Sequence, residues 1–199
     1  MNYPQQSPID IDSSTIRTSE VWHPSCSYPD ARWQERDSPF NAGMVPVPAG
    51  SGGHLRIGDG SEPLAVVEFH THAPSEHLWD GVQGAGELHI VHVDGDRTSV
   101  LALRLAIGRR NAAVDRLLER QGALSALLPP GRTACTYLGS RTTPPFGQEV
   151  RWFVVDEAVE VTDAQLRALV GEHAENARRV FDLGDRVVDA AALEVDGGP

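Results

Sequence analysis

Five of the eight histidines in this chain are crowded into residues 69–93. His70 and His72 are two residues apart in an alternating, β-branched segment, so on a strand both rings would project from one face. His89 lies in a second segment of this kind, and if the two strands pair, the three rings can converge on one point. Three neutral imidazoles with one open position are the ligand set of a catalytic zinc site. The spacing therefore favours Zn²⁺ as a cofactor.

Carboxylates beside these histidines add to the zinc interpretation. Glu87 shares a predicted strand face with His89, and a zinc-bound histidine usually donates its second N–H to such a group. His92 takes the other face, where a hydrogen-bonded core histidine is expected. The alternative is that Glu76 and Glu87 are ordinary surface charges, but Glu87 lies inside an apolar strand and fits that alternative poorly.

The elements that must position these residues are mostly strands. Alternation predicts strands over 64–72, 87–93 and 99–107, with further strand character over 136–155 around a turn at 142–145. The prolines of residues 21–48 indicate irregular chain with short edge pieces. We expect a mostly β (α+β) single domain over residues 1–199, with a large twisted sheet and a few peripheral helices.

Two helices are expected outside the sheet. Apolar residues at near-helical spacing predict one helix over 111–128, ended by Pro129 and Pro130. A second begins at Thr162, with Gln165 in the position that completes a capping box. Its apolar face is expected to continue as far as Ala177.

Composition excludes several classes of protein. The 199 residues carry 17 Lys+Arg and 28 Asp+Glu, a net charge of −11, which argues against binding to nucleic acid. No apolar stretch approaches the roughly 20 residues of a membrane helix. The start of the chain has no signal-peptide pattern. Cys26 and Cys135 are too few for a disulfide framework, so a cytoplasmic protein is expected.

Several motifs of the chain resemble those of the α-class carbonic anhydrases, in a bacterial, divergent and shortened form. They occur in the family's order from residue 6 to about residue 188. They are QSPIDI (6–11), EFHTHAPSEHLWDG (68–81), GELHIVHVDGD (86–96), YLGSRTTPPF (137–146), EVRWFVV (149–155) and NARRVFDLGDRVV (176–188). The resemblance implies a large, mainly antiparallel sheet with zinc at its centre, and a lyase that hydrates carbon dioxide reversibly to bicarbonate with a zinc-activated hydroxide.

The resemblance also implies roles around the metal. His70, His72 and His89 would be the zinc ligands. Glu87 would orient His89, with His77 and Tyr137 in the surrounding hydrogen bonds.

A second set of implied roles concerns the substrate, a small molecule. Thr142 would accept a hydrogen bond from the reacting hydroxide and donate its own to Glu76. Thr143 would help to place the substrate. Val91, Val100 and Trp152 would form an apolar wall suited to carbon dioxide.

Three positions depart from the family pattern. Met44 stands where the family's proton-shuttle histidine is usual, and methionine cannot carry a proton. Arg141 replaces a leucine before Thr142, which would crowd the pocket and attract anions. Glu68 replaces a glutamine on the face of His70, and an ion pair between Arg141 and Glu68 is a hypothesis.

These departures leave two alternatives to carbonic anhydrase activity. One is a zinc hydrolase or lyase of the same fold, acting on a larger or anionic substrate. The other is a non-catalytic relative that binds a partner, which the complete set of three histidines with Thr142 and Glu76 disfavours. The sequence leaves the oligomeric state open.

Overall fold

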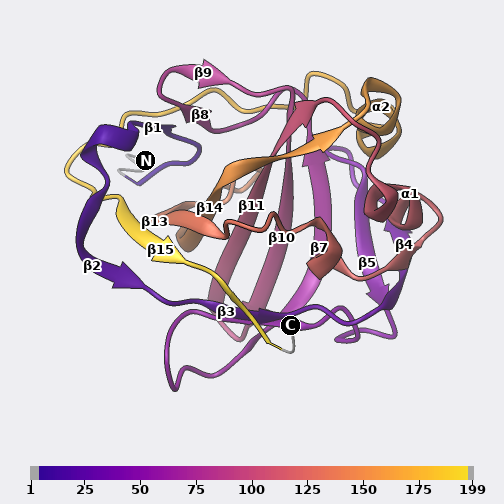
Figure 1. The fold of residues 1–199 in the computed structure, drawn as a ribbon, viewed down its shortest axis with the longest axis horizontal. Coiled ribbons are helices and arrows are strands. Elements are labelled where there is room, and N and C mark those ends of the chain that lie inside the picture. Colours follow the sequence, from indigo (N-terminus) through magenta and orange to yellow (C-terminus); the bar gives the residue numbers. More distant parts are fainter. Residues whose placement is uncertain (1–4, 197–199) are drawn as a thin grey trace.

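One large sheet organises residues 5–196, the part of the chain that the computed structural model describes (Figure 1). Most neighbouring strands are antiparallel, and the parallel pairs join residues 97–107 to 148–161, 189–192 to 17–22 and 194–195 to 25–27. The expectation of a mostly β fold with a large, mainly antiparallel sheet is confirmed. The order of the main path is β12 (Gln121–Gly122), β4 (Ala31–Arg36), β5 (Gly43–Val47), β7 (Leu64–His72), β10 (Gly86–Asp94), β11 (Arg97–Ile107), β14 (Gln148–Val161), β13 (Thr133–Ser140), β15 (Asp189–Ala192) and β2 (Arg17–Trp22).

Short strands complete the fold beside this path. Strands β6 (His54–Arg56), β3 (Ser25–Ser27) and β16 (Glu194–Val195) join the margin of the large sheet at β7. A separate small sheet is made of β1 (Asp10–Ile11), β8 (Leu78–Trp79) and β9 (Val82–Gln83).

Alternation along the central strands sorts their side chains onto two faces. Phe69, Leu88 and Ile90 enter one large apolar core that continues under the helices. Val91 and Trp152 enter a second, smaller apolar cluster on the other face, the face of the histidines. The central strands are therefore buried on both faces around the histidines, and their buried polar residues gather mainly on the face of the histidines.

The first helix is shorter than predicted. Helix α1 covers Ala112–Leu118 and does not continue to residue 128. Arg120 and Gly122 have φ values of 62° and 125°, outside the helical range, and residues 121–122 pair with β4. A short 3₁₀ turn, η2 (Leu124–Leu127), carries the remaining leucines into the core. Leucine spacing alone did not reveal this break.

The second helix begins as predicted and ends early. Helix α2 covers Asp163–Val170, and both hydrogen bonds of the capping box between Thr162 and Gln165 are present. It ends at Gly171, whose φ of 61° glycine adopts at little cost, so the expected helical face does not reach Ala177. Among the described residues, no helix has the length and apolar character needed to cross a membrane.

The proline-rich residues 21–48 are more regular than predicted. They hold β4 and β5, which belong to the large sheet, and a 3₁₀ turn η1 (Ser13–Thr15) precedes them on the way to β2. Pro46 lies in β5, but β5 pairs with β7 only through Gly43 and Met44. The proline therefore stands where one neighbour is missing and its lack of an N–H matters least.

Candidate metal centre

Three histidine rings meet on one face of the sheet, where β7 and β10 pair. His89 is directly opposite His70 in the antiparallel register, and His72 follows on β7. One nitrogen of each ring lies within 4.8 Å of the others, and the ring centroids are 4.8–5.2 Å apart. All three side chains are buried. The structure thus brings together the three residues that the sequence singles out as metal ligands.

A protein acceptor faces the outer nitrogen of each ring. Nδ1 of His72 lies 3.3 Å from the carbonyl oxygen of Asn176, and Nε2 of His89 lies 2.8 Å from Oε1 of Glu87. Nδ1 of His70 lies 3.1 Å from Oε1 of Glu68. Carbonyl and carboxylate oxygens only accept, so Nδ1 of His72 and Nε2 of His89 carry the proton. Nδ1 of His70 is at ion-pair distance from Glu68 but makes no hydrogen bond among the described residues. The inner lone pairs belong to Nε2 of His70, Nε2 of His72 and Nδ1 of His89.

The inner atoms fit a metal ion. Both ring nitrogens of His70, Nε2 of His72 and Oε2 of Glu76 are buried and have no hydrogen-bond partner among the described residues. Burial lowers the pKa of His70, His72 and His89, which keeps the rings neutral. Neutral imidazoles with orphaned lone pairs are what Zn²⁺ requires, whereas a hydrogen-bonded core would leave no such atoms.

Behind His89 lies a buried hydrogen-bond chain. Oε1 of Glu87 is 2.6 Å from Nδ1 of His77, and Nε2 of His77 is 2.7 Å from the hydroxyl of Tyr137. That hydroxyl donates to Oγ of Ser7 at 2.9 Å. Burial by itself would raise the pKa of Glu87, but the rings of His77 and His89 hold it well below its ordinary value. Glu87 is therefore an anion that fixes the orientation of His89.

His77, Glu87 and His89 form a second group with spacing suited to a metal. Its atoms are already bonded to each other, at 2.6 Å and 2.8 Å. A metal there would have to displace both hydrogen bonds. The three-histidine group has its lone pairs free and is the better site.

A narrow pocket of about 30 Å³ opens beside the rings of His70 and His89. The residues expected at the substrate position line it, together with Thr98, which the sequence did not single out. They are Glu68, Val91, Val100, Arg141, Thr142, Thr143 and Trp152.

Two predicted contacts differ in the structure. The ion pair predicted between Arg141 and Glu68 is wrong, because Glu68 pairs with Arg36, whose Nε lies 2.6 Å from Oε2. Arg141 is exposed at the pocket and donates to Oγ1 of Thr98 at 3.4 Å. The hydrogen bond from Thr142 to Glu76 is not present among the described residues, and Oε1 of Glu76 accepts the backbone N–H of Arg178 at 2.8 Å.

Met44 does not face the rings. It is opposite Phe69 in the register, whereas Gly43 is opposite His70. Its side chain lines a different cavity, between β4, β5 and the two helices. Met44 therefore neither carries a proton at the site nor blocks it.

Sequence reasoning missed several residues that support the site. Ser7 is hydrogen-bonded to Tyr137, the backbone carbonyl of Asn176 to His72, and the backbone N–H of Arg178 to Glu76. All three lie within the motifs QSPIDI and NARRVFDLGDRVV, which could have pointed to them. Arg36 lies in no motif.

With this geometry in view, comparison with known proteins gives the family. The family model described as eukaryotic-type carbonic anhydrase matches residues 1–191. The chain therefore belongs to the eukaryotic-type, or alpha, carbonic anhydrase family.

Individual members of the family are similar to this chain in sequence and in structure. Carbonic anhydrase 1 of Oryctolagus cuniculus is 28% identical over 196 residues, covering 81% of this chain and 83% of that protein. A carbonic anhydrase of Pectobacterium atrosepticum is 33% identical over 164 residues, covering 74% of this chain and 66% of that protein. The alpha-carbonic anhydrase of Thermovibrio ammonificans, solved with the inhibitor sulfanilamide, superposes with a TM-score of 0.81 at 30% identity, covering 93% of this chain and 86% of that one.

Proposed function

We propose that this protein is a zinc-dependent carbonic anhydrase that converts carbon dioxide and water reversibly to bicarbonate and a proton. The observation that carries the proposal is the set of inward lone pairs on His70, His72 and His89, next to a pocket of small volume. A zinc ion, when bound, acts as a Lewis acid and lowers the pKa of a coordinated water to about 7, so that hydroxide is available near neutral pH.

The residues around the rings hold the ligands in place. Glu87 and the carbonyl of Asn176 accept the outer N–H groups of His89 and His72, which fixes both tautomers. The chain through His77 and Tyr137 in turn fixes the carboxylate of Glu87. A site positioned in advance avoids reorganisation during the reaction.

The residues of the pocket supply orientation and an apolar lining. One wall of the pocket is apolar and suits an uncharged, apolar substrate; it consists of Val91, Val100 and Trp152. Thr142 lines the pocket with its hydroxyl, and Oε2 of Glu76 is buried without a hydrogen-bond partner among the described residues. We infer that Thr142 and Glu76 together orient the attacking oxygen, and that Thr143 helps to place the carbon dioxide.

The size of the pocket favours carbon dioxide over the alternatives. A volume of about 30 Å³ beside the rings suits a molecule of a few atoms. Arg141 at the pocket suits an anion, and bicarbonate is the anion of this reaction. The three free lone pairs argue against a non-catalytic relative, since a binding protein has no need of them.

Stopped-flow measurement of carbon dioxide hydration tests the proposal. The zinc-loaded protein is assayed in concentrated imidazole buffer, because Met44 supplies no proton carrier at the site. A rate that rises with protein and with imidazole concentration is expected. A zinc-loaded protein with no rate above buffer would end the proposal and leave the hydrolase alternative, tested next with an ester substrate.

Two further expectations remain proposals. We propose that residues 1–199 form one such domain, which is supported by the family match over residues 1–191. We propose a cytoplasmic location, supported by free thiols at Cys26 and Cys135, which are buried in separate apolar clusters.

A further inference from the structure

Glu68, the carboxylate next to the outer nitrogen of His70, also forms an ion pair with Arg36. Oε1 of Glu68 lies 3.1 Å from Nδ1 of His70, and Oε2 lies 2.6 Å from Nε of Arg36. Both contacts are at ion-pair distance, and neither nitrogen has a partner in hydrogen-bond geometry among the described residues. The residues come from different strands, Arg36 from β4 and Glu68 and His70 from β7. The side chain of Glu68 is only 20% exposed, so an unpaired carboxylate there would be costly. His70 is thus the one ligand of the three whose outer partner is itself held by an ion pair.

The path of Arg36 to Glu68 depends on a glycine. Strand β5 lies between β4 and β7, and Gly43 of β5 is opposite both Arg36 and His70. A Cβ added at Gly43 would lie 2.9 Å from both Nε and Nη2 of Arg36. The guanidinium therefore occupies the space that any other residue at 43 would fill. The side chain of Arg36 can pass over β5 in this position because residue 43 is glycine.

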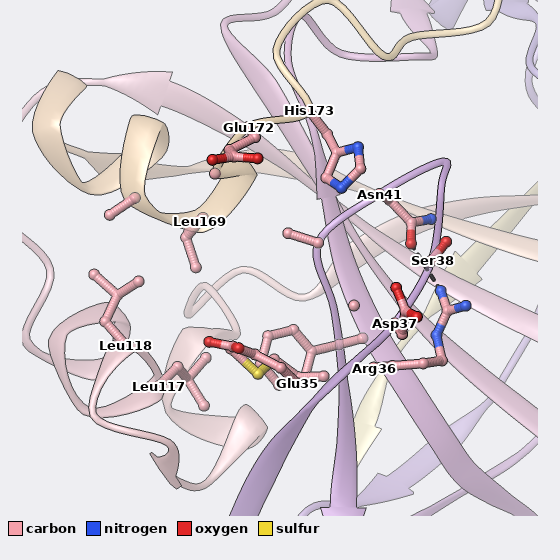
Figure 2. Close-up of a pocket in the computed structure, with 16 residues that line it drawn as sticks. Glu35, Arg36, Asp37, Ser38, Asn41, Leu117, Leu118, Leu169, Glu172 and His173 are labelled. Carbon is pink, nitrogen blue, oxygen red and sulfur yellow. Dashed lines mark hydrogen bonds between the residues drawn. The ribbon is translucent and has the colours of Figure 1, made fainter.

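Arg36 is also fixed from its other side. Nη2 donates to Oδ1 of the buried Asn41 at 2.7 Å, and the guanidinium borders a cavity of about 690 Å³ (Figure 2). The cavity lies between β4, β5 and the two helices, and it leaves the side chain of Arg36 33% exposed. Small solutes can therefore reach the guanidinium position without passing through the pocket beside the histidines.

We propose that Arg36 is a positioning residue for the metal ligand His70, acting through Glu68; this inference rests on the proposed function, because it assumes that His70 binds zinc. Arg36 holds one carboxylate oxygen, so that the other faces Nδ1 of His70. The proton then stays on Nδ1, and the lone pair of Nε2 points at the metal position. Without Arg36 the carboxylate is free to turn away and the ring loses its orientation.

A double-mutant cycle on zinc affinity tests this role. Arg36→Met keeps an unbranched apolar stem and removes the guanidinium with its charge, and we expect it to weaken zinc binding about tenfold, measured by competition with a chelator. In the Glu68→Gln background, where no ion pair exists, the same change should have less than a twofold effect. A tighter zinc complex in Arg36→Met, the result of simply removing a positive charge, or equal effects in both backgrounds, would overturn the proposal.

Two controls separate positioning from a structural role. Asn41→Ala removes the other contact of Arg36 and leaves its pair with Glu68, so zinc affinity should stay within twofold. Guanidinium ions at low millimolar concentration, entering through the cavity, should restore zinc affinity in Arg36→Ala but not in Arg36→Ala/Glu68→Gln. Failure of rescue in the single variant, with its fold intact by circular dichroism, would count against the proposal.

The tautomer of His70 gives a readout without zinc. In the zinc-free protein, ¹⁵N NMR should show the proton on Nδ1 of His70, and Arg36→Met should mix the two tautomers. An unchanged tautomer would contradict the inference. If the unaltered protein binds no zinc at all, the proposed function fails instead, and the two failures are distinguishable.

Discussion

Two buried histidines on strand β10, His89 and His92, differ in whether both of their ring nitrogens have hydrogen-bond partners. Both are almost fully inaccessible to solvent, and burial lowers the pKa of both. Both nitrogens of His92 have partners, the hydroxyl of Tyr28 at 2.9 Å from Nε2 and the carbonyl of Ser99 at 3.3 Å from Nδ1. Nδ1 of His89 has no hydrogen bond among the described residues, and its nearest carboxylate oxygen, on Glu76, is 3.9 Å away.

The comparison shows what distinguishes a ligand from a core residue. Burial and a lowered pKa are common to both, so neither identifies a metal site. The free inner nitrogen does, and it lies on the face of the sheet where Nε2 of His70 and Nε2 of His72 also have no hydrogen-bond partner among the described residues. His92 faces the apolar core, as predicted, where leaving a nitrogen without a partner would cost stability.

Replacing His89 should have the largest effect. In His89→Ala one of three ligands is lost, so bound zinc should fall to background by elemental analysis and hydration should fall to the buffer rate. His92→Gln is the matched control and should retain one zinc per chain. Loss of zinc from both variants would mean that the comparison is wrong.

Removing the hydroxyl of Thr142 should slow the reaction while the metal stays bound. Loss of one aligned hydrogen-bonding group of this kind costs about a hundredfold in kcat. Thr142→Ala is compared with Thr142→Ser, which keeps the hydroxyl and should retain most of the rate. If Thr142→Ala is as active as the parent, Thr142 has no part in orienting the attacking oxygen.

His92→Ala should act on stability and not on chemistry. It leaves the hydroxyl of Tyr28 without its partner and opens a cavity, which together cost about 2–4 kcal/mol. The free energy of unfolding is measured by urea titration with zinc present. A change in the free energy of unfolding below about 0.5 kcal/mol would show that His92 does not contribute to the stability of the core.

The pH dependence of the zinc-free protein sharpens the same contrast. Burial lowers the pKa of His92 in the folded protein to about 3 from the ordinary value of 6.5, so between these pH values the unfolded chain binds more protons than the folded one. The contribution of His92 to the free energy of unfolding is therefore complete above about pH 6.5 and declines as the pH falls toward 3. The free energy of unfolding should change less steeply with pH below pH 6.5 in His92→Gln. An unchanged slope would show that His92 does not contribute to the pH dependence of stability.

The smallest effect is expected at Arg141. Its exposed charge at the pocket is worth less than about 1 kcal/mol, so Arg141→Leu should raise kcat/KM for hydration by about fivefold at most and weaken inhibition by anions. Arg141→Lys, which keeps the charge, should preserve anion inhibition. Equal anion inhibition in Arg141→Leu and the parent would show that the side chain does not act on anions.

The strands of the site were predictable because their pattern is local. The predicted strand over 64–72 coincides with β7, since alternation and β-branched residues report a strand buried on both faces. Helix α1 was predicted too long, because the break at Arg120 and Gly122 arises from pairing of residues 121–122 with β4, a contact that the leucine spacing does not record.

The site itself was predictable as far as its motifs extend. The ligands, Glu87 and the predicted pocket residues except Val100 lie in motifs, and the structure brings them together. The partner of Glu68 was not predictable, because Arg36 reaches it across a third strand through the space that Gly43 leaves. Such a contact depends on strand order, which the sequence does not state.

Anomalous diffraction at the zinc edge tests the central claim most directly. A crystal of the zinc-loaded protein should show a single peak bonded to Nε2 of His70, Nε2 of His72 and Nδ1 of His89, the three inner nitrogens. A peak within the group of His77, Glu87 and His89, or no peak on this face of the sheet, would contradict the account.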